Sequence, residues 1–272
     1  MSETCMKDLA GKVLFNLEVA EDFYLLRLAV PQIAEGVVPG QFVEVKVSSN
    51  YSPFLRIPLS ICKTDPALGT IDLLYEDLGP KSRALSLQQP GCEIAVLGPL
   101  GNGFKVTEGD RTAILVGGGI GIPPLLFLAG ELRRAGRQVV LLVGARNGKK
   151  HLPDNLLNAA AGEIRKATDD GSAGHHGLVT DLLTEKLTGG KRFSVYTCGP
   201  HAMMAAVTAI CKGHRIPCQA SLEEYMACGF GVCVGCVVEL RPPENETFSS
   251  PYLQYSRICI DGPVFDAHRV CW

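Results

Sequence analysis

The first third of the chain alternates short apolar runs with turn-forming residues. Such runs lie at 13–17, 24–30, 42–47, 71–75 and 94–97, and the third of them alternates apolar and polar positions. Turn formers such as Pro39-Gly40 separate the runs, and no helical period interrupts them. This pattern predicts the antiparallel strands of a small β-barrel.

The pattern changes after residue 111. An apolar run at 112–116 leads into a glycine-rich turn and then an amphipathic segment at 123–135, which begins with proline and is followed by Gly136. Further apolar runs lie at 139–144 and 194–197, and a helix capped by Thr180 is expected between them. Alternating strands and helices of this kind predict a doubly wound parallel sheet.

The expected fold class is therefore β + α/β, in a chain of 272 residues that is long enough for two domains and a small module. We expect the antiparallel β-barrel at 1–108, the doubly wound α/β domain at 109–217 and the C-terminal module at 218–272. One uncharged stretch, 113–130, has the length of a membrane span, but its glycines and prolines favour the core of a soluble domain.

Composition narrows the class of protein further. A net charge of -2 gives no reason to expect nucleic acid as a partner. Residues 1–8 lack the basic start and apolar run of a signal peptide, so a cytoplasmic location is expected. Eleven cysteines in such a chain are expected as reduced thiols and metal ligands, not as a disulfide framework.

Four of these cysteines follow the C-x4-C-x2-C-x22-C spacing that is typical of a plant-type [2Fe–2S] cluster: Cys228, Cys233, Cys236 and Cys259. Three glycines within the loop leave room for backbone N–H groups to approach the cluster and supply positive-φ conformations. A zinc site, a disulfide or buried thiols are the alternatives, but only Cys233 and Cys236 have the C-x2-C spacing of a zinc pair. The spacing thus predicts a cluster and, with it, electron transfer; most of the other seven cysteines are expected to be small buried side chains.

Other segments are candidates for nucleotide binding. The turn at 117–121 joins a strand to a helix N-terminus, where backbone amides and the helix dipole favour phosphate. Cys198, Gly199 and Pro200 follow the strand at 194–197, at the edge where open α/β sheets bind ligands. In the barrel, residues 55–61 place a cation, a proline and a hydroxyl together, although an ordinary strand with one exposed arginine is the plain alternative. Tyr75, with Lys81 and Ser82, offers an aromatic ring, a cation and a hydroxyl nearby.

Taken in order, these motifs resemble those of the ferredoxin-reductase superfamily and, more narrowly, the electron-transfer subunits of type 1B dihydroorotate dehydrogenase. They are an R-x-P-x-S-like strand, G-G-G-I-G-I-P-P-L, C-G-P-x-x-M-M and the cysteine pattern. The loop that begins at Thr168 and the Asp261-Gly262-Pro263 turn extend the likeness to nearly the whole chain. The same turn favours Cys259 over Cys271 as the last cluster ligand.

The resemblance implies positions for two further cofactors. FAD is expected against Ile57, Pro58, Leu59 and Ser60, with Ser60 near its reactive edge, and against Leu74, Tyr75, Glu76, Lys81 and Ser82. The superfamily places an arginine where this chain has Ile57, so Arg56, one residue earlier, is expected to reach a flavin phosphate with help from Lys81. Ser60 and Cys198 are the expected catalytic residues. The expected nicotinamide dinucleotide site comprises Gly117, Gly118, Gly119, Ile120, Gly121, Cys198, Gly199 and Pro200.

The same cofactors fit one another chemically. A nicotinamide exchanges a hydride, a [2Fe–2S] cluster carries single electrons, and a flavin converts between the two. By resemblance, the partner is an FMN-containing dihydroorotate dehydrogenase catalytic subunit in de novo pyrimidine (UMP) synthesis, within a heterotetramer of two plus two chains. No acid stands at 144–150 to read a ribose hydroxyl, so the choice of NAD over NADP rests on the resemblance.

Two alternatives remain open at this point. One is the flavin and iron–sulfur subunit of a sulfide dehydrogenase or of an NADH-dependent ferredoxin:NADP oxidoreductase. The other is a non-enzymatic redox sensor or zinc module. A cofactor analysis separates the second of these from the first, because only an electron carrier holds both flavin and iron.

Overall fold

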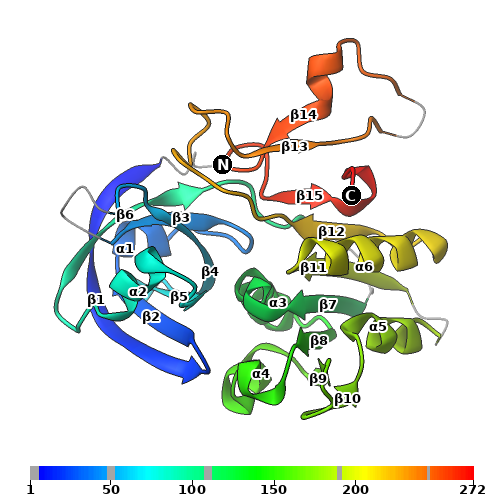
Figure 1. Ribbon diagram of the computed structural model, residues 1–272, viewed down its shortest axis with the longest axis horizontal. Helices are drawn as coiled ribbons and strands as arrows, with labels where there is room; N and C mark the ends of the chain where they lie inside the picture. The colour runs from blue at the N-terminus through cyan, green and yellow to red at the C-terminus, as the bar shows by residue number, and fades with distance from the viewer. Residues whose placement is uncertain (1–5, 48–52, 107–111, 189–191, 244–245) are drawn as a thin grey trace.

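The computed structural model describes residues 6–47, 53–106, 112–188, 192–243 and 246–272. Within these ranges the N-terminal part forms a barrel beside an α/β unit, and the C-terminal segment lies over both (Figure 1). The expected boundary between residues 108 and 109 lies outside the described residues, as do Cys5 and most of the N-terminal segment on which the expected location rests.

The barrel is closed and has the strand order β1-β2-β5-β4-β3-β6. Every neighbouring pair is antiparallel, so the predicted antiparallel barrel is confirmed. Alternate positions, such as Leu26 and Leu28 or Val43 and Val45, are fully buried, as the period of two requires. The strands are β1 (Lys7–Ala20), β2 (Phe23–Ala29), β3 (Phe42–Lys46), β4 (Ile57–Asp65), β5 (Thr70–Glu76) and β6 (Glu93–Leu100).

Two short helices, α1 (Pro31–Ala34) and α2 (Pro80–Ser86), interrupt the strands, so the expectation of no helix in this region was wrong. Each begins with a proline, which suits the first helical position, and each is too short to leave a helical period in the sequence. The Ser82 hydroxyl accepts the backbone N–H groups of Leu78 and Gly79 and fixes the start of α2.

The α/β unit is a seven-stranded sheet with the order β10-β9-β8-β7-β11-β12-β15. All its pairs are parallel except β12 with β15, so the expected doubly wound parallel sheet is confirmed apart from one antiparallel edge strand. The strands are β7 (Thr112–Gly118), β8 (Val139–Ala145), β9 (Glu163–Thr168), β10 (His175–His176), β11 (Phe193–Cys198), β12 (Cys218–Ser221) and β15 (Val264–Asp266).

Helices cover both faces of this sheet (Figure 1). Alternate residues of β7 enter different hydrophobic clusters: Leu115 packs with α3, whereas Ile114 packs with α5 and α6. The helices are α3 (Pro123–Arg134), α4 (Asp154–Ala160), α5 (Val179–Leu187) and α6 (His201–Gly213). Thr180 lies inside α5 and is not its cap; the Asp181 carboxylate accepts the N–H of Leu178 at 2.9 Å instead.

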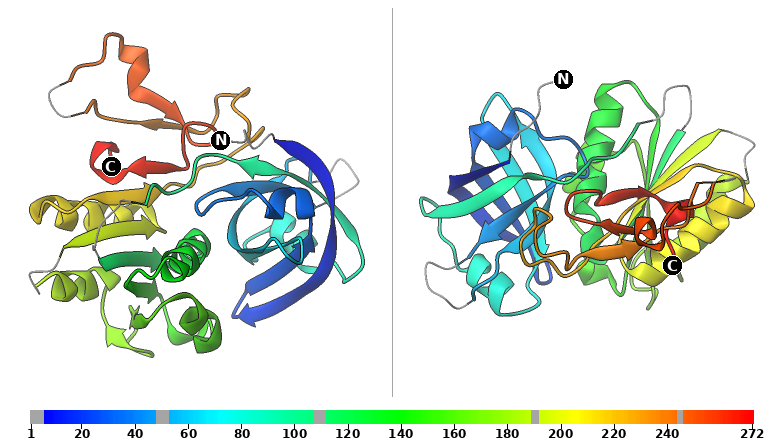
Figure 2. Two further views of the ribbon diagram at one scale, coloured as in Figure 1. Left: turned by 180° about the vertical axis from the view of Figure 1, so that it is seen from behind. Right: turned by 90° about the horizontal axis from the view of Figure 1, so that it is seen from above.

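The C-terminal segment ties the two larger parts together. After β12 it passes the barrel, where Gly229 packs against Glu44 of β3, and then forms the hairpin of β13 (Val237–Glu239) and β14 (Tyr255–Arg257). It returns as β15 to the sheet edge, and the hairpin projects from the body (Figures 1 and 2). Among the described residues, no helix combines the length and the apolar character needed to cross a membrane.

Candidate cofactor sites

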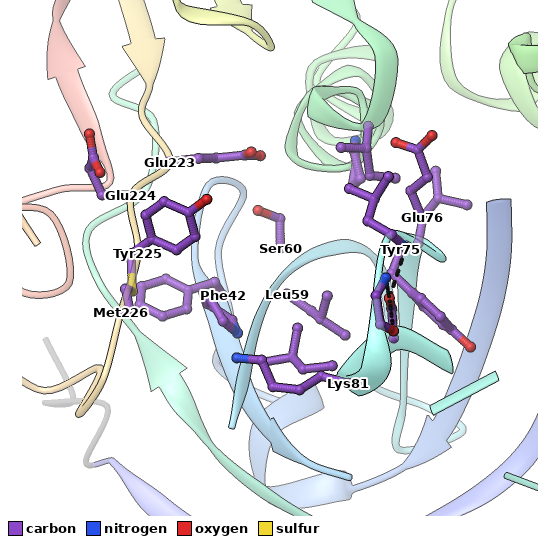
Figure 3. A pocket seen from close by; sticks show the side chains of 18 of the residues that line it. Phe42, Leu59, Ser60, Tyr75, Glu76, Lys81, Glu223, Glu224, Tyr225 and Met226 are labelled. Atoms are coloured by element: carbon purple, nitrogen blue, oxygen red, sulfur yellow. Dashed lines mark hydrogen bonds between the residues drawn. The ribbon is translucent and has the colours of Figure 1, made fainter. Parts of the chain in front are cut away.

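A cavity of about 660 Å³ lies between the barrel and the α/β unit. Strands β4 and β5 and the start of α2 form one side of it, and the linker at 222–226 forms another (Figure 3). Ten residues that the sequence nominated line this cavity: Ile57, Pro58, Leu59, Ser60, Leu74, Tyr75, Glu76, Lys81, Ser82 and Ile120. These positions are up to 63 residues apart in the sequence, and the fold brings them together around one cavity. Its volume is within the range of cofactor-binding pockets.

Ser60 lies on β4 opposite Phe42 of β3, and its hydroxyl faces the cavity. The carboxyl group of Glu223 and the hydroxyl group of Tyr225 point to the same part of the space (Figure 3). Sequence reasoning missed both linker residues, because neither carries a motif and only the path of the chain brings them opposite Ser60. The three side chains form a polar corner in an otherwise largely apolar cavity.

The two cations of this region differ in their position relative to the cavity. Arg56 is not among the residues that line the cavity; its guanidinium pairs with Asp8 at 2.8 Å. Lys81 does line the cavity, and its ammonium group donates to the backbone oxygen of Arg56 at 3.1 Å. Of these two cations, Lys81 is therefore the one that lies at the cavity.

Tyr75 was expected to offer its ring for stacking, but the barrel already uses that ring. It stacks on Tyr24 with 5.6 Å between ring centroids, and its hydroxyl donates to Asn16 at 2.9 Å. Its neighbour Glu76 pairs with Lys150 at 2.9 Å. Tyr225 also lines the cavity, and its side chain is 96% exposed.

The glycine turn and the Cys198-Gly199-Pro200 segment lie side by side, although they are not among the residues that line this cavity, apart from Ile120. Cys198 is in register with Gly117 on the neighbouring strand, and a Cβ on Gly121 would lie 2.4 Å from the backbone nitrogen of Gly199. The two turns thus meet at the carboxyl edge of the sheet, next to the N-terminus of α3. That arrangement supports the expected dinucleotide site.

The thiol of Cys198 is fully buried and lies 3.9 Å from the carboxyl group of Glu223. Burial raises the pKa of Cys198 well above its usual range, so the thiol stays protonated at neutral pH. The protein around the cavity also raises the pKa of Glu223, although solvent reaches this residue. A protonated thiol, that of Cys198, and a carboxyl group of raised pKa, that of Glu223, therefore lie beside the cavity.

The four predicted cluster ligands lie in two contacting pairs, Cys228 with Cys233 in the loop and Cys236 with Cys259 at the base of the hairpin. The backbone N–H of Cys233 donates to the Cys228 sulfur and that of Cys259 to the Cys236 sulfur, each at 3.4 Å. A backbone bond of 2.8 Å from Ile258 to Cys236 holds the two segments together. Gly229 and Gly231 have positive φ as expected, whereas Val234 supplies the next positive φ in place of Gly235.

The thiols differ in charge and exposure. Burial acts to raise the pKa of Cys228, but N–H groups from residues 230, 232 and 233 lower it to about 6, so a thiolate forms readily. Burial, together with the neighbouring Cys236, raises the pKa of Cys259 to about 12. Cys236 and Cys259 are buried and Cys233 is exposed. N–H groups directed at sulfur fit an iron–sulfur cluster.

Glu44 is an unexpected neighbour of this loop. It is fully buried on β3, neither carboxyl oxygen has a hydrogen-bond partner within the described part of the chain, and a Cβ on Gly229 would lie 2.7 Å from it. Burial raises the pKa of Glu44 to about 7, against the opposing charges of Lys81 and Arg56. No pattern in the sequence distinguishes Glu44 from an exposed polar position of an alternating strand.

Glu44 makes the stability of the fold depend on pH. Because its folded pKa of about 7 exceeds that of an unfolded glutamate, its stabilising effect is present at low pH and is lost as pH rises toward 7 and beyond. Between pH 5 and pH 8, ionisation of Glu44 is expected to lower the free energy of unfolding of the wild type by up to about 3 kcal/mol. Glu44→Gln should not show this decrease, because glutamine does not ionise. Urea denaturation at both pH values measures this, with Glu35→Gln, an exposed carboxylate, as the control. Equal pH dependence in wild type and Glu44→Gln would contradict the assignment.

The fold and the two sites together define a reductase of the ferredoxin-reductase class that carries an iron–sulfur module. Two family models match the chain. The "Oxidoreductase NAD-binding domain" matches residues 115–209, and the "Iron-sulfur cluster binding domain of dihydroorotate dehydrogenase B" matches residues 223–271. The chain belongs to the family of dihydroorotate dehydrogenase B electron transfer subunits.

Curated relatives in this family match almost the whole length of the chain. The electron transfer subunit of dihydroorotate dehydrogenase B (NAD(+)) from Geobacillus kaustophilus (strain HTA426) is 41% identical over 93% of this chain and 94% of its own length. The subunit of the same name from Desulforamulus reducens is 35% identical over 96% of this chain and 97% of its own. The resemblance stated from the motifs is thereby confirmed, as are the iron–sulfur cluster, NAD and FAD as cofactors of this oxidoreductase subunit.

A solved structure has the same architecture. It comes from work described as "Insights into flavin-based electron bifurcation via the NADH-dependent reduced ferredoxin-NADP oxidoreductase structure" and superposes with a TM-score of 0.83 at 29% identity. The match covers 97% of this chain and 90% of that one. The fold is thus shared with an NADH-dependent ferredoxin:NADP oxidoreductase, the first of the two alternatives left open by the sequence. The dihydroorotate dehydrogenase subunits have the higher sequence identities.

Proposed function

We propose that this chain passes electrons between NAD(H) and the FMN of a separate dihydroorotate dehydrogenase catalytic subunit, in pyrimidine synthesis. One observation carries the proposal: the linker at 222–226 lines the cavity and runs directly into Cys228, the first predicted cluster ligand. Ile120 of the glycine turn lines the same cavity. The cavity is therefore bordered by segments that lead to the proposed nicotinamide site and to the proposed cluster site.

The cavity is the proposed FAD site. Bound FAD supplies the exchange between two-electron and one-electron chemistry. Ile57, Pro58 and Leu59 of β4 form one wall, and Tyr225 offers an exposed aromatic ring on the side of the linker. Lys81, which lines the cavity, supplies the cation that favours the phosphates.

The proposed nicotinamide dinucleotide site is the turn at 117–121 together with Cys198, Gly199 and Pro200. Backbone amides of the glycine turn, ahead of the two prolines that begin α3, are the proposed donors to its phosphates, and the small residues allow close approach of the ring. Ser60, Cys198 and Glu223 lie around the expected position of hydride exchange. The raised pKa of Cys198 keeps its thiol protonated, so the Ser60 hydroxyl and the Cys198 thiol are available as hydrogen-bond donors there, while burial shifts the pKa of Glu223 upward.

Cys228, Cys233, Cys236 and Cys259 are the proposed ligands of a [2Fe–2S] cluster. We further propose domain boundaries near residues 108 and 217, a cytoplasmic location, and an assembly of two such chains with two catalytic subunits. The partnership is supported by the name of the relatives, since an electron transfer subunit implies a catalytic subunit.

An anaerobic titration with NADH, and then with NADPH, tests the proposal. We expect a flavin and about two irons per chain, with both chromophores bleached by NADH, and reoxidation on addition of the FMN subunit and orotate. A colourless, iron-free protein after reconstitution would contradict it. The shared fold of the ferredoxin-NADP oxidoreductase favours a second candidate function, which electron transfer to ferredoxin but not to the FMN subunit would support.

Ser60→Ala tests the proposed geometry of hydride exchange. Loss of the hydroxyl that faces the cavity is expected to slow reduction of the bound flavin by NADH about 100-fold, because this group orients the reacting rings. Stopped-flow absorbance measures the rate, and FAD content should not change. Ser86→Ala, which removes an exposed hydroxyl that donates to Arg83 of its own helix, is the matched control. A rate equal to that of the control would remove Ser60 from the site.

A further inference from the structure

Lys150 joins the α/β unit to the barrel through its side chain. It ends a single turn of 3₁₀-helix, Gly148–Lys150, which follows β8 at the carboxyl edge of the sheet. Its ammonium group lies 2.8 Å from the carboxylate of Asp22 and 2.9 Å from that of Glu76, and both acceptors belong to the barrel. Asp22 lies in the turn between β1 and β2, and Glu76 is the last residue of β5. One cation of the α/β unit thus bridges two segments of the barrel.

The backbone around Lys150 is itself fixed. The side-chain oxygen of Asn147 accepts the backbone N–H groups of Lys149 at 3.0 Å and of Lys150 at 3.2 Å. On the barrel side, the backbone N–H of Glu21 donates to the backbone oxygen of Lys149 at 3.1 Å. The ion pairs and this backbone bond therefore join the same two turns of the chain.

The bridge is partly shielded from water. The side chains of Lys150 and Glu76 are 20% and 16% exposed, and the ammonium group lies 5.3 Å from the centre of the buried Phe23 ring. Burial acts to lower the pKa of Lys150, but the two carboxylates raise it above its usual value, so the ammonium group stays charged. Because water screens such a site less than an open surface, the bridge constrains the two units more than an exposed ion pair would.

The two units that Lys150 joins carry different cofactor sites. Glu76 lines the proposed FAD cavity on the barrel side (Figure 3). The turn of Lys150 follows β8, whose Gly144 is in register with Gly118 at the proposed dinucleotide site. The distance between flavin and nicotinamide therefore depends on how the α/β unit sits on the barrel. A misplacement of about 1 Å can slow a reaction between bound groups about 100-fold.

A second contact fixes the two units at another place. Helix α3 contacts β4, and its Phe127 is buried in the hydrophobic cluster of the barrel. The β1–β2 turn is at the lower end of the barrel in Figure 1, and α3 lies above it. Two bodies joined at one contact can rotate about it, whereas two separated contacts prevent this rotation. Lys150 supplies the contact away from α3.

We propose that Lys150 is a positioning residue for hydride exchange: held between Asp22 and Glu76, its ammonium group fixes the α/β unit on the barrel and thereby aligns the nicotinamide with the flavin. The inference rests on the proposed function and deepens it. Loss of the ammonium group releases the β1–β2 turn from the α/β unit, while the side chains that line the two cofactor sites are unchanged. The rate of hydride exchange should then fall, and the affinity for NADH should not.

The test compares four variants of the reconstituted holoprotein. Lys150→Met removes the charge and keeps most of the length, Lys150→Arg restores a cation, and Asp22→Asn removes one of the two ion pairs. Lys149→Met, at the exposed neighbouring lysine, is the matched control. Stopped-flow absorbance gives the limiting rate of flavin reduction and the apparent Kd for NADH, and FAD and iron are measured for each variant. Hydrogen exchange without NADH follows the backbone N–H of Glu21.

We expect Lys150→Met to lower the limiting rate about tenfold or more, with less than about a twofold change in the apparent Kd and with unchanged FAD and iron. Exchange at Glu21 should be faster, because the turn opens more often. Lys150→Arg should recover most of the rate, Asp22→Asn should give an intermediate rate, and the control should behave like wild type.

A wild-type limiting rate in Lys150→Met would overturn the proposal, as would a loss of rate that only follows a loss of FAD. If Lys150→Met does not fold, a wild-type rate and wild-type exchange at Glu21 in Asp22→Asn would overturn it equally. Failure of NADH to reduce the wild-type flavin would instead overturn the proposed function, and this inference with it.

Discussion

Cys236→Ser is expected to abolish the iron–sulfur cluster and to leave reduction of the flavin by NADH intact. Cys236 is buried and accepts the N–H of Cys259, and a serine hydroxyl at this position does not supply a thiolate to iron. Iron content should fall from about two per chain toward zero. Dihydroorotate-dependent reduction of NAD by the assembled complex should fall at least about 100-fold, since ligand loss exceeds the effect of outer-shell changes.

Two controls accompany this variant. Cys92→Ser removes an exposed cysteine of the barrel and should change neither iron nor activity. Cys271→Ser tests the alternative fourth ligand: full iron content in this variant, together with its loss in Cys259→Ser, supports Cys259. Full iron content in Cys236→Ser would show that the loop does not hold a four-cysteine cluster.

Gly121→Ala is expected to disrupt the dinucleotide site from the inside. The added Cβ would lie 2.4 to 2.6 Å from backbone atoms of Gly199 and Cys198, and backbone does not move aside as a flexible side chain does. The turns after β7 and β11 would be forced apart. We expect a loss of about 3 kcal/mol or more of folding free energy and, in any soluble protein, failure of reduction by NADH.

Thermal denaturation followed by far-UV circular dichroism measures the first effect, and NADH titration measures the second. Gly213→Ala is the matched control, because nothing lies within 4 Å of the added Cβ at the end of α6. That substitution should stabilise the protein by about 0.4–1 kcal/mol through the unfolded chain. A Gly121→Ala protein as stable as wild type, with normal NADH kinetics, would show that the two turns do not pack so closely.

The sequence by itself predicted the features that are encoded locally. Apolar runs such as 42–47 and 139–144 became strands, because the spacing of buried side chains along a strand depends on the few residues of that strand. The cysteine loop was recognisable for the same reason, since three of its four thiols lie within nine residues. The glycine turn before α3 likewise follows from neighbouring residues alone.

Only the tertiary structure decided which distant side chains meet. Glu223 and Tyr225 reach the cavity because the linker after β12 crosses it, and Glu44 becomes buried because the cysteine loop packs on β3. Arg56 turned to Asp8, since an ion pair across the barrel was within its reach. The two short helices also escaped notice, as fewer than two turns leave no period in the sequence.

The path of the chain therefore determines the partners of these side chains, and residue type alone does not. A buried carboxyl group such as Glu44 and an exposed ring such as Tyr252 look ordinary in the sequence, because their neighbours come from segments far away along the chain. Periodicity reports the burial that a residue shares with its own element. Long-range packing decides which surface covers that element and which of its side chains stay exposed. This packing forms only when the whole chain is folded.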